Sequence, residues 1–151
     1  MRIDLTDVSG CTCLAARRLA RQLTRAYDRA LEEADLTVNQ FGLLAKLYGA
    51  SLGGRKAVPL GALAARVGMH PTTLNRDLKV LKTRKLVADA ADPGDKRVRG
   101  LTITAGGTVA LRAAIPLWRK AQARLEQSLG RDAASLRRAL ATAVATLERG
   151  E

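Results

Sequence analysis

One short segment carries most of the side chains whose hydrogen bonds could recognise another molecule. Leu74, Leu78 and Leu81 recur at helical spacing, so if they face a core, the polar residues between them project outward. These polar residues are Thr72, Thr73, Asn75, Arg76 and Lys79. Arginine pairs with guanine and asparagine with adenine through two hydrogen bonds, while threonine binds phosphates or base edges. The segment therefore predicts contacts with bases and phosphates, and a merely solvated helix face is the alternative.

The remaining reactive side chains are too few for catalysis or metal binding. The chain has one histidine, His70, and two cysteines, Cys11 and Cys13. A metal site needs three or four ligands, and no set of nucleophile, general acid and general base is present. His70 is interpreted as a turn residue. We expect no enzyme activity, no metal and no cofactor.

The charge balance indicates a polyanionic partner. The 151 residues contain 26 Lys and Arg against 14 Asp and Glu, which gives a formal net charge of +12, and basic surfaces attract phosphate backbones. The aromatic residues are Tyr27, Phe41, Tyr48 and Trp118, too few to stack single-stranded bases or to anchor a membrane-surface helix. Double-stranded DNA is the predicted partner class.

No segment indicates a membrane or a secreted location. The apolar runs are shorter than the roughly 20 residues that span a bilayer, and residues 1–7 lack a signal-like apolar stretch. With 47% hydrophobic residues the chain can build a core. We expect a soluble, cytoplasmic protein with reduced thiols and no membrane partner.

The segment of polar side chains belongs to a pair of short helices joined by a turn. Residues 58–68 are expected to form the first helix, with Gly68 as its C-terminal stop. Met69 and His70 make the turn, and Pro71 suits the first position of the second helix, over residues 72–84. This spacing is typical of a helix-turn-helix, which favours DNA contact by Arg76 over the solvated alternative.

The rest of the chain adds a β-hairpin and long helices. Residues 86–90 and 101–104 are predicted strands, and the Pro93-Gly94 turn between aspartates makes a charged wing. Thr37 and Gln40 form a capping-box pattern before a helix, and residues 49–56 are expected to be a loop. The other predicted helices are 11–34, 108–129 (kinked by Pro116) and 131–149.

The predicted fold class is mainly α with a small β-wing. A winged helix-turn-helix DNA-binding domain occupies residues 36–104. N- and C-terminal helices over residues 1–35 and 105–151 flank it and are expected to form a dimerisation region, because pairing with a second copy would best bury their Ala- and Leu-rich faces.

From Cys13 to the C-terminus the sequence resembles the MarR family of transcriptional regulators. The resemblance rests on Leu36-Thr37-x-x-Gln40-Phe41-x-Leu43-Leu44, Leu63-Ala64-x-Arg66-Val67-Gly68, Thr72-Thr73-Leu74-Asn75-Arg76, Asp92-Pro93-Gly94-Asp95-Lys96-Arg97 and Leu101-Thr102-Ile103-Thr104-x-Gly106-Gly107. It implies a homodimeric repressor on an inverted-repeat operator. It also implies that Arg97 enters the minor groove, held by Asp95, while Lys96 and Arg99 contact phosphates.

The resemblance implies an effector as well. Related dimers bind small aromatic or phenolic ligands between the dimerisation helices and the winged domain, where Phe41, Tyr48 and Trp118 are the candidates here. Plain core packing is the alternative for each.

A second kind of effector is an oxidant. In a hydroperoxide-sensing branch of the family, a cysteine near the start of the first helix is paired with a tyrosine fourteen residues later. Cys13 and Tyr27 show that spacing, with Cys11 as a further thiol. Arg17 stands where that branch has a second tyrosine, and it either stabilises a thiolate or is a surface arginine. A cysteine that merely packs as a small hydrophobe is the alternative.

The predicted function is therefore sequence-specific regulation of transcription by a homodimer, released by a small ligand or by cysteine oxidation. A nucleoid-type architectural protein that binds DNA by charge alone is the rival. An adaptor that uses the winged fold to bind protein is a third possibility.

Overall fold

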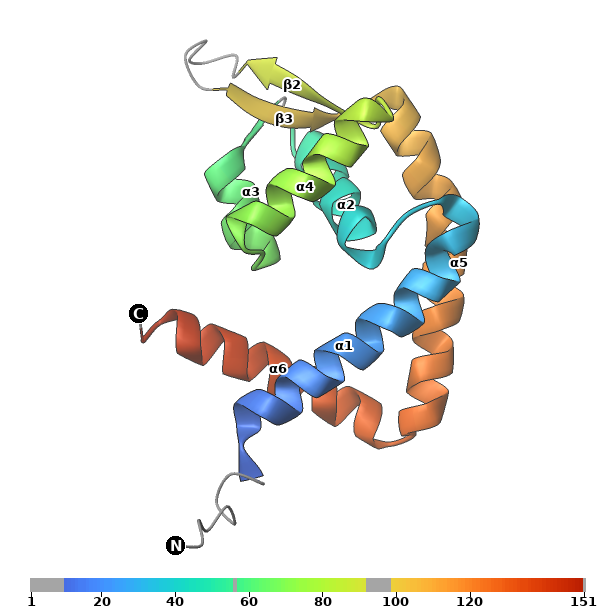
Figure 1. Ribbon diagram of the computed structural model, residues 1–151, viewed down its shortest axis with the longest axis vertical. Coiled ribbons are helices and arrows are strands. Elements are labelled where there is room, and N and C mark those ends of the chain that lie inside the picture. Colours follow the sequence, from blue (N-terminus) through green and yellow to red (C-terminus); the bar gives the residue numbers. More distant parts are fainter. Residues whose placement is uncertain (1–9, 56, 92–98, 151) are drawn as a thin grey trace, which may run out of the picture.

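A computed structural model describes residues 10–55, 57–91 and 99–150 of the chain. Within these ranges lie six α-helices, one 3-10 turn and a small antiparallel sheet, so the predicted mainly helical fold with a β-wing is confirmed (Figure 1). In chain order the elements are α1 (Thr12–Leu31), η2 (Glu32–Ala34), α2 (Val38–Leu52), β1 (Val58–Pro59), α3 (Leu60–Val67), α4 (Pro71–Thr83), β2 (Val87–Ala91), β3 (Arg99–Ile103), α5 (Ala105–Leu129) and α6 (Asp132–Glu148).

Helix α2 begins at the predicted capping box. Thr37 Oγ1 accepts the backbone N–H of Gln40, and Gln40 Oε1 accepts the backbone N–H of Thr37, both at 3.2 Å. The two bonds satisfy donors that the start of a helix leaves free. The helix then continues through Gly49 to Leu52, so the prediction of a loop over residues 49–56 is wrong for its first four residues. Ala50 is buried in the core, and this tertiary contact outweighs the low helix propensity of the glycine.

The sheet has the strand order β1-β3-β2. Strand β2 pairs with β3 from Val87↔Ile103 to Ala91↔Arg99, and β1 pairs with β3 through Val58↔Leu101. The predicted helix over residues 58–68 is therefore wrong at its start, because Val58 and Pro59 are a strand and α3 begins at Leu60. A residue that precedes proline avoids the α conformation, and the edge of β3 offers it a partner.

Helix α5 begins three residues earlier than predicted, at Ala105. Thr104 caps it by accepting the backbone N–H of Gly107 at 2.9 Å. The helix also continues uninterrupted through Pro116.

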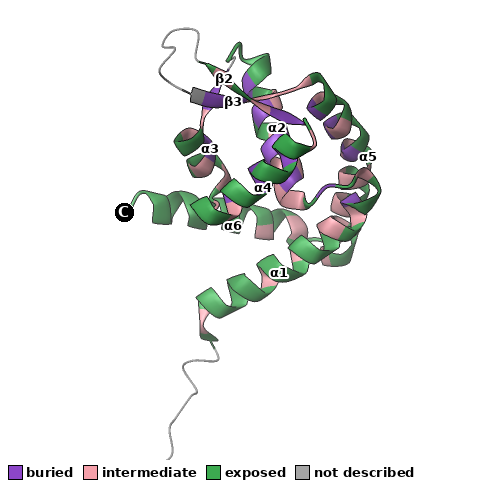
Figure 2. Cartoon of the chain, turned by 45° about the horizontal axis from the view of Figure 1, so that its top comes forward, coloured by how far each residue is buried: buried purple, intermediate pink, exposed green. Residues whose placement is uncertain are grey.

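The core lies mainly within the winged domain, and Leu31 of α1 with Leu111 and Ala114 of α5 join it from the flanking helices. Leucines of α2, α3 and α4 pack with the strands and the first half of α5; the fully buried ones include Leu43, Leu44, Leu63, Leu74 and Leu81. Figure 2 shows buried residues concentrated there, whereas α1 and α6 are mainly exposed. Helix α6 contains no buried residue at all. The flanking helices thus leave most of their surface without intramolecular packing.

Candidate nucleic-acid interface

The turn between α3 and α4 is built from local signals. Gly68 ends α3 in the left-handed conformation (φ 59°) and donates its N–H to the Ala64 carbonyl at 3.0 Å, a geometry that glycine adopts without steric strain. His70 is the N-cap of α4, and its Nδ1 accepts the Thr72 N–H at 3.3 Å. Pro71 occupies the first turn of the helix. His70 therefore serves the turn, in agreement with its interpretation from the sequence.

Helix α4 has one buried and one exposed face. Leu74, Asp77, Leu78 and Leu81 are buried. Of the predicted DNA-contacting residues, Thr72, Asn75, Arg76 and Lys79 are exposed, and Thr73 is half-buried. The α4 segment thus presents its base-reading groups to solvent at the N-terminal part of the helix. In Figure 1, α4 lies across α2, with the β2–β3 hairpin near its C-terminal end.

Asp77 is a residue that the sequence reasoning missed. It is 5% exposed, and its Oδ2 has no hydrogen-bond partner in the described part of the chain. Burying a carboxylate oxygen without a partner is unfavourable. Only its place on the leucine side of the helix, three residues after Leu74, could have identified it as buried.

An ion pair fixes α4 against the wing. Lys82 Nζ lies 2.7 Å from Asp89 Oδ1 of β2. Asn75 and Lys79 line a hollow of about 580 Å³ together with this pair, Leu60 and residues of β3. Two of the predicted DNA-contacting residues therefore lie close to the strands that support the wing.

The predicted wing tip falls mostly outside the described residues. Asp95, Lys96 and Arg97 lie in the segment 92–98, which joins β2 to β3 and is not described. Arg99 begins β3 opposite Ala91, and its side chain is also outside the description. The roles of these four residues remain predictions.

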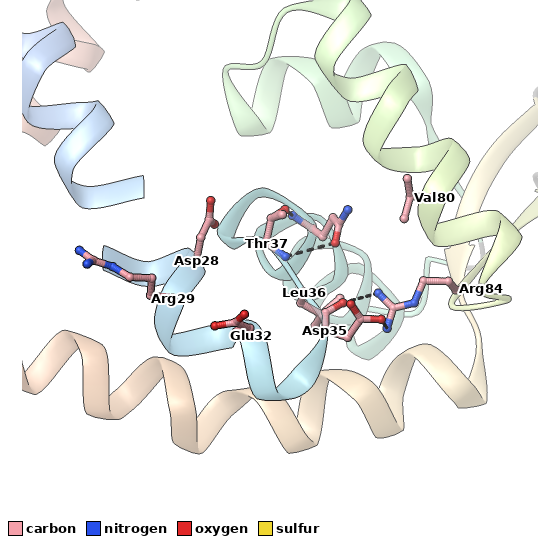
Figure 3. Close-up of a pocket in the computed structure, with 9 residues that line it drawn as sticks. Asp28, Arg29, Glu32, Asp35, Leu36, Thr37, Val80 and Arg84 are labelled. Carbon is pink, nitrogen blue, oxygen red and sulfur yellow. Dashed lines mark hydrogen bonds and ion pairs between the residues drawn. The ribbon is translucent and has the colours of Figure 1, made fainter. Parts of the chain in front are cut away.

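The C-terminal end of α4 is tied to the junction of α1 and α2 (Figure 3). Arg84 forms an ion pair with Asp35 at 3.2 Å and donates a second hydrogen bond to the Asp35 carbonyl. On the other side of the junction, Asp28 Oδ1 of α1 accepts the Val38 N–H at 2.7 Å. Asp28, Asp35 and Arg84 border a hollow of about 480 Å³. Asp35 and Arg84 therefore connect the α1–α2 junction to the end of α4.

A chain of hydrogen bonds links α1, α5 and α6. Tyr27 Oη donates to Gln122 Oε1, and Gln122 Nε2 donates to Glu126 Oε1 at 2.8 Å. Arg137 of α6 donates to the same carboxylate oxygen at 2.7 Å. Partial burial and the nearby Glu126 charge raise the pKa of Tyr27. Hydrogen bonds from Gln122 and then from Arg137 lower the pKa of Glu126.

The predicted redox residues are separated within one chain. Cys13 is exposed and Cys11 is half-buried, and both are free thiols. Cys13 and Tyr27 lie fourteen residues apart on α1, a rise of about 21 Å at 1.5 Å per residue. The Tyr27 hydroxyl already binds Gln122, and Arg17 is exposed. A Cys13–Tyr27 contact therefore requires a second subunit.

The predicted ligand residues pack at the edge of the core. Phe41 and Trp118 stack, with ring centroids 5.9 Å apart and planes at 15°, and Tyr48 also contacts the core cluster. This stacking joins α2 of the winged domain to α5. The arrangement accounts for Phe41 and Trp118 as core packing, and a role in ligand binding stays a prediction.

Two further features of the described residues bear on function. No three His, Cys, Asp or Glu side chains in them are grouped to hold a metal ion. None of their helices has both the length and the apolar character that crossing a bilayer requires.

Known proteins with similar structures and sequences are regulators of transcription. The transcriptional regulator MosR of M. tuberculosis is 38% identical, with a TM-score of 0.79 over 93% of this chain and 97% of MosR. MosR in complex with DNA is 40% identical, with a TM-score of 0.77 over 93% and 98% of the two chains. YhbI of Bacillus subtilis, an uncharacterised HTH-type transcriptional regulator, is 25% identical over 135 residues, covering 89% of this chain and 84% of YhbI. No family model matches the chain.

These relatives span nearly the whole chain at identities that establish common descent. The TM-scores show that the two MosR structures share the fold of this chain. The chain belongs to the MarR family of winged helix-turn-helix DNA-binding transcriptional regulators.

Proposed function

We propose that the protein is a homodimeric repressor that binds an inverted-repeat operator in double-stranded DNA and is released by an effector. The observation that carries this proposal is the exposed face of α4, where Thr72, Asn75, Arg76 and Lys79 stand opposite the buried leucines. The DNA complex of MosR, at 40% identity, supports it.

The N-terminal half of α4 enters the major groove. Arg76 has the geometry to donate two hydrogen bonds to guanine, and Asn75 can pair in the same way with adenine. Thr72 and Thr73, in the first turn, meet phosphates or base edges, where the positive end of the helix dipole also favours an anion. Lys79, one turn after Asn75, contacts a phosphate. Specificity then resides in Asn75 and Arg76, and affinity in the cations.

The helices that flank residues 36–104 form the dimer. Leu136, Leu140, Val144 and Leu147 recur at i, i+4, i+8 and i+11 of α6, and the last three are 42–73% exposed. An exposed apolar stripe of this kind marks an interaction surface. A two-fold dimer through residues 1–35 and 105–151 presents two α4 helices to half-sites about one DNA turn apart.

The operator test compares specific with non-specific binding. Fluorescence anisotropy measures affinity for the DNA upstream of the gene and for a scrambled duplex at matched salt. The wild type is expected to prefer the upstream DNA by a factor of about 10³ or more. Arg76→Ala should reduce that preference by about tenfold, which corresponds to one base contact, while Arg119→Ala, with the same change of charge on α5, should preserve it.

Other outcomes identify the competing functions. Equal affinity for both duplexes would show a nucleoid-type protein that binds by charge alone. If Arg76→Ala and Arg97→Ala both preserved regulation in cells, the winged domain would serve as a protein-binding adaptor.

Release by an effector can be tested with the same operator. Cys13 is exposed in the first turn of α1, so an oxidant in solution can reach its sulfur. A thiolate there attacks an organic hydroperoxide, which forms the sulfenic acid and the alcohol. Hydroperoxide should then release the wild type and leave Cys13→Ser bound. Equal release of both proteins would contradict release by oxidation of Cys13. If a phenolic ligand instead releases the wild type but not Trp118→Ala, the effector is a small molecule.

A further inference from the structure

A basic hollow lies on the winged domain, and none of its lining residues belongs to α4. It has a volume of about 450 Å³ and is lined by Ala45, Lys46, Gly49, Ala50, Gly53, Arg55 and Arg66. Lys46 comes from α2, Arg55 from the segment that follows α2, and Arg66 from the last turn of α3. Three exposed cationic side chains from three positions in the chain thus border one open hollow whose other lining residues are alanines and glycines.

The positive charge at this hollow has no counter-charge nearby in the sequence or in the described contacts. Residues 36–76 contain no aspartate or glutamate. The ion pairs among the described residues join Lys82 to Asp89, Arg84 to Asp35 and Arg137 to Glu126, so none involves the three cations of the hollow. Like charges brought together without a counter-ion repel one another. A bound anion would remove that repulsion.

Gly49 lies in the wall of the hollow. It lies within α2 with an ordinary helical backbone, and a Cβ added there would meet no atom within 4 Å. Packing therefore does not require glycine, and alanine would favour the helix. The effect of the glycine is to leave the wall of the hollow without a side chain. Gly100 and Gly107 differ, because neighbouring backbone leaves no room there for a Cβ.

We propose that this hollow is a phosphate-binding site. Arginine and lysine form strong charge-assisted hydrogen bonds with phosphate oxygens, and a space walled by alanine and glycine admits a compact anion. Arg66 lies two residues before Gly68, the residue that ends α3 and leads into α4. A phosphate held by Arg66 therefore acts on the helix-turn-helix unit itself. The phosphate comes either from the DNA backbone or from a free phosphorylated small molecule.

The first arm of the test concerns DNA phosphates. Operator affinity is measured from 50 to 300 mM NaCl for the wild type, Lys46→Gln, Arg66→Gln and the charge-matched control Arg119→Gln. If the hollow binds the DNA backbone, log K falls less steeply with log salt in Lys46→Gln and in Arg66→Gln. The magnitude of the slope should decrease by about 0.9 in each, the value for one lost phosphate contact. The preference for operator over scrambled DNA stays unchanged, and so does the slope of the control.

The second arm concerns free anions. Pyrophosphate is titrated into the protein without DNA, at constant ionic strength, and binding is followed by calorimetry and thermal unfolding. A free-ligand site gives a Kd that Arg66→Gln weakens about tenfold, as expected for one charge-assisted hydrogen bond. Gly49→Ala should also weaken it while raising the melting temperature. Gly42→Ala, in the same helix and equally unhindered, should raise the melting temperature and leave pyrophosphate binding intact.

The outcomes separate this site from the proposed function. A changed salt slope in the hollow variants, with no change in Arg119→Gln, supports a site for DNA phosphates. A weaker pyrophosphate Kd in the hollow variants, with no change in Gly42→Ala, supports a site for a free phosphorylated molecule. If neither quantity differs from the controls, the phosphate site is disproved and the three cations serve only the helix C-termini. Operator recognition through Arg76 is measured in a separate experiment. If Arg76 proves not to recognise the operator, the result for the phosphate site is unaffected.

Discussion

At the scale of the residue, the junction between α4 and α5 depends on a glycine that the helix itself disfavours. A Cβ on Gly107 would lie 2.1 Å from the Leu86 carbonyl oxygen and 2.7 Å from Ile103 Cγ1. At the adjacent Gly106 the nearest atoms would be 3.6 Å away, an ordinary contact distance. Thr104 completes the junction, since its Oγ1 donates to the Lys85 carbonyl at 2.7 Å and accepts from Gly107. Close backbone approach therefore fixes the start of α5 on the end of α4.

The two glycines predict opposite effects of the same substitution. Gly107→Ala forces α5 away from Leu86 and should lower the free energy of unfolding by about 3 kcal/mol, as overpacking does. Gly106→Ala should raise it by up to about 1 kcal/mol through helix propensity. Urea denaturation followed by circular dichroism measures both. Equal effects at the two positions would contradict the packing argument.

At the scale of the element, a chain of side-chain hydrogen bonds connects α1, α5 and α6. Helix α6 has no buried residue, yet Arg137 joins it to Glu126 of α5, and Gln122 joins α5 to Tyr27 of α1. Protonation of two groups in this network is linked to stability. Burial raises the pKa of Tyr27, so the folded state favours the neutral phenol. This preference stabilises the folded state at pH values below the ordinary tyrosine pKa of about 10. The stabilisation is lost as pH rises through the raised pKa of Tyr27.

Tyr27→Phe should therefore flatten the alkaline limb of the stability curve. At neutral pH the variant loses one hydrogen bond, at a cost of about 1 kcal/mol. As pH rises above the ordinary tyrosine pKa of about 10, its stability should fall less steeply than that of the wild type, because the variant has no phenol at position 27. Denaturant unfolding across this range provides the measurement. Parallel curves for the two proteins would rule out a raised pKa.

The contribution of Glu126 to stability depends on pH in the opposite direction. Hydrogen bonds from Gln122 and Arg137 lower the pKa of Glu126. Its contribution is therefore present above its ordinary value of about 4.3 and is lost as pH falls through the lowered pKa. Because Glu126 is in contact with solvent, added salt should weaken this contribution.

At the scale of the whole molecule, the flanking helices carry much of the positive charge as well as the exposed apolar stripe. Helix α1 has five arginines and one aspartate. Bringing two copies together must offset repulsion between such helices, so we expect apolar contact to drive association and salt to assist it. The stripe on α6 is the surface available for that contact.

Val144→Asp should disrupt the dimer. The substitution places a charge within the stripe and should weaken association by at least about tenfold, or 1.4 kcal/mol. Thr142→Asp, which lies about 200° around the helix from Leu140, has the same added charge and should leave the dimer intact. Light scattering after gel filtration reports the mass of each. A monomeric wild type would contradict both the proposed dimer and the proposed inverted-repeat operator.

Features whose causes lie within a few residues were predictable from the sequence. The capping box of Thr37 and Gln40, the helix stop at Gly68 and the proline at the start of α4 each depend on local backbone chemistry, and all three occur where predicted. The leucine spacing of α4 also predicted which of its residues face solvent, since helical periodicity fixes the direction of each side chain. The sequence by itself thus determined the helix-turn-helix and the face that we propose for DNA.

Only the tertiary structure decided features that depend on contacts between distant segments. Val58 and Pro59 form a strand because β3 lies alongside them, and α2 extends to Leu52 because Ala50 reaches the core. The link from Tyr27 to Arg137 and the meeting of Lys46, Arg55 and Arg66 likewise join positions that no local pattern connects. Side-chain periodicity is set by the backbone of one element, whereas these contacts follow from how separate elements pack against one another.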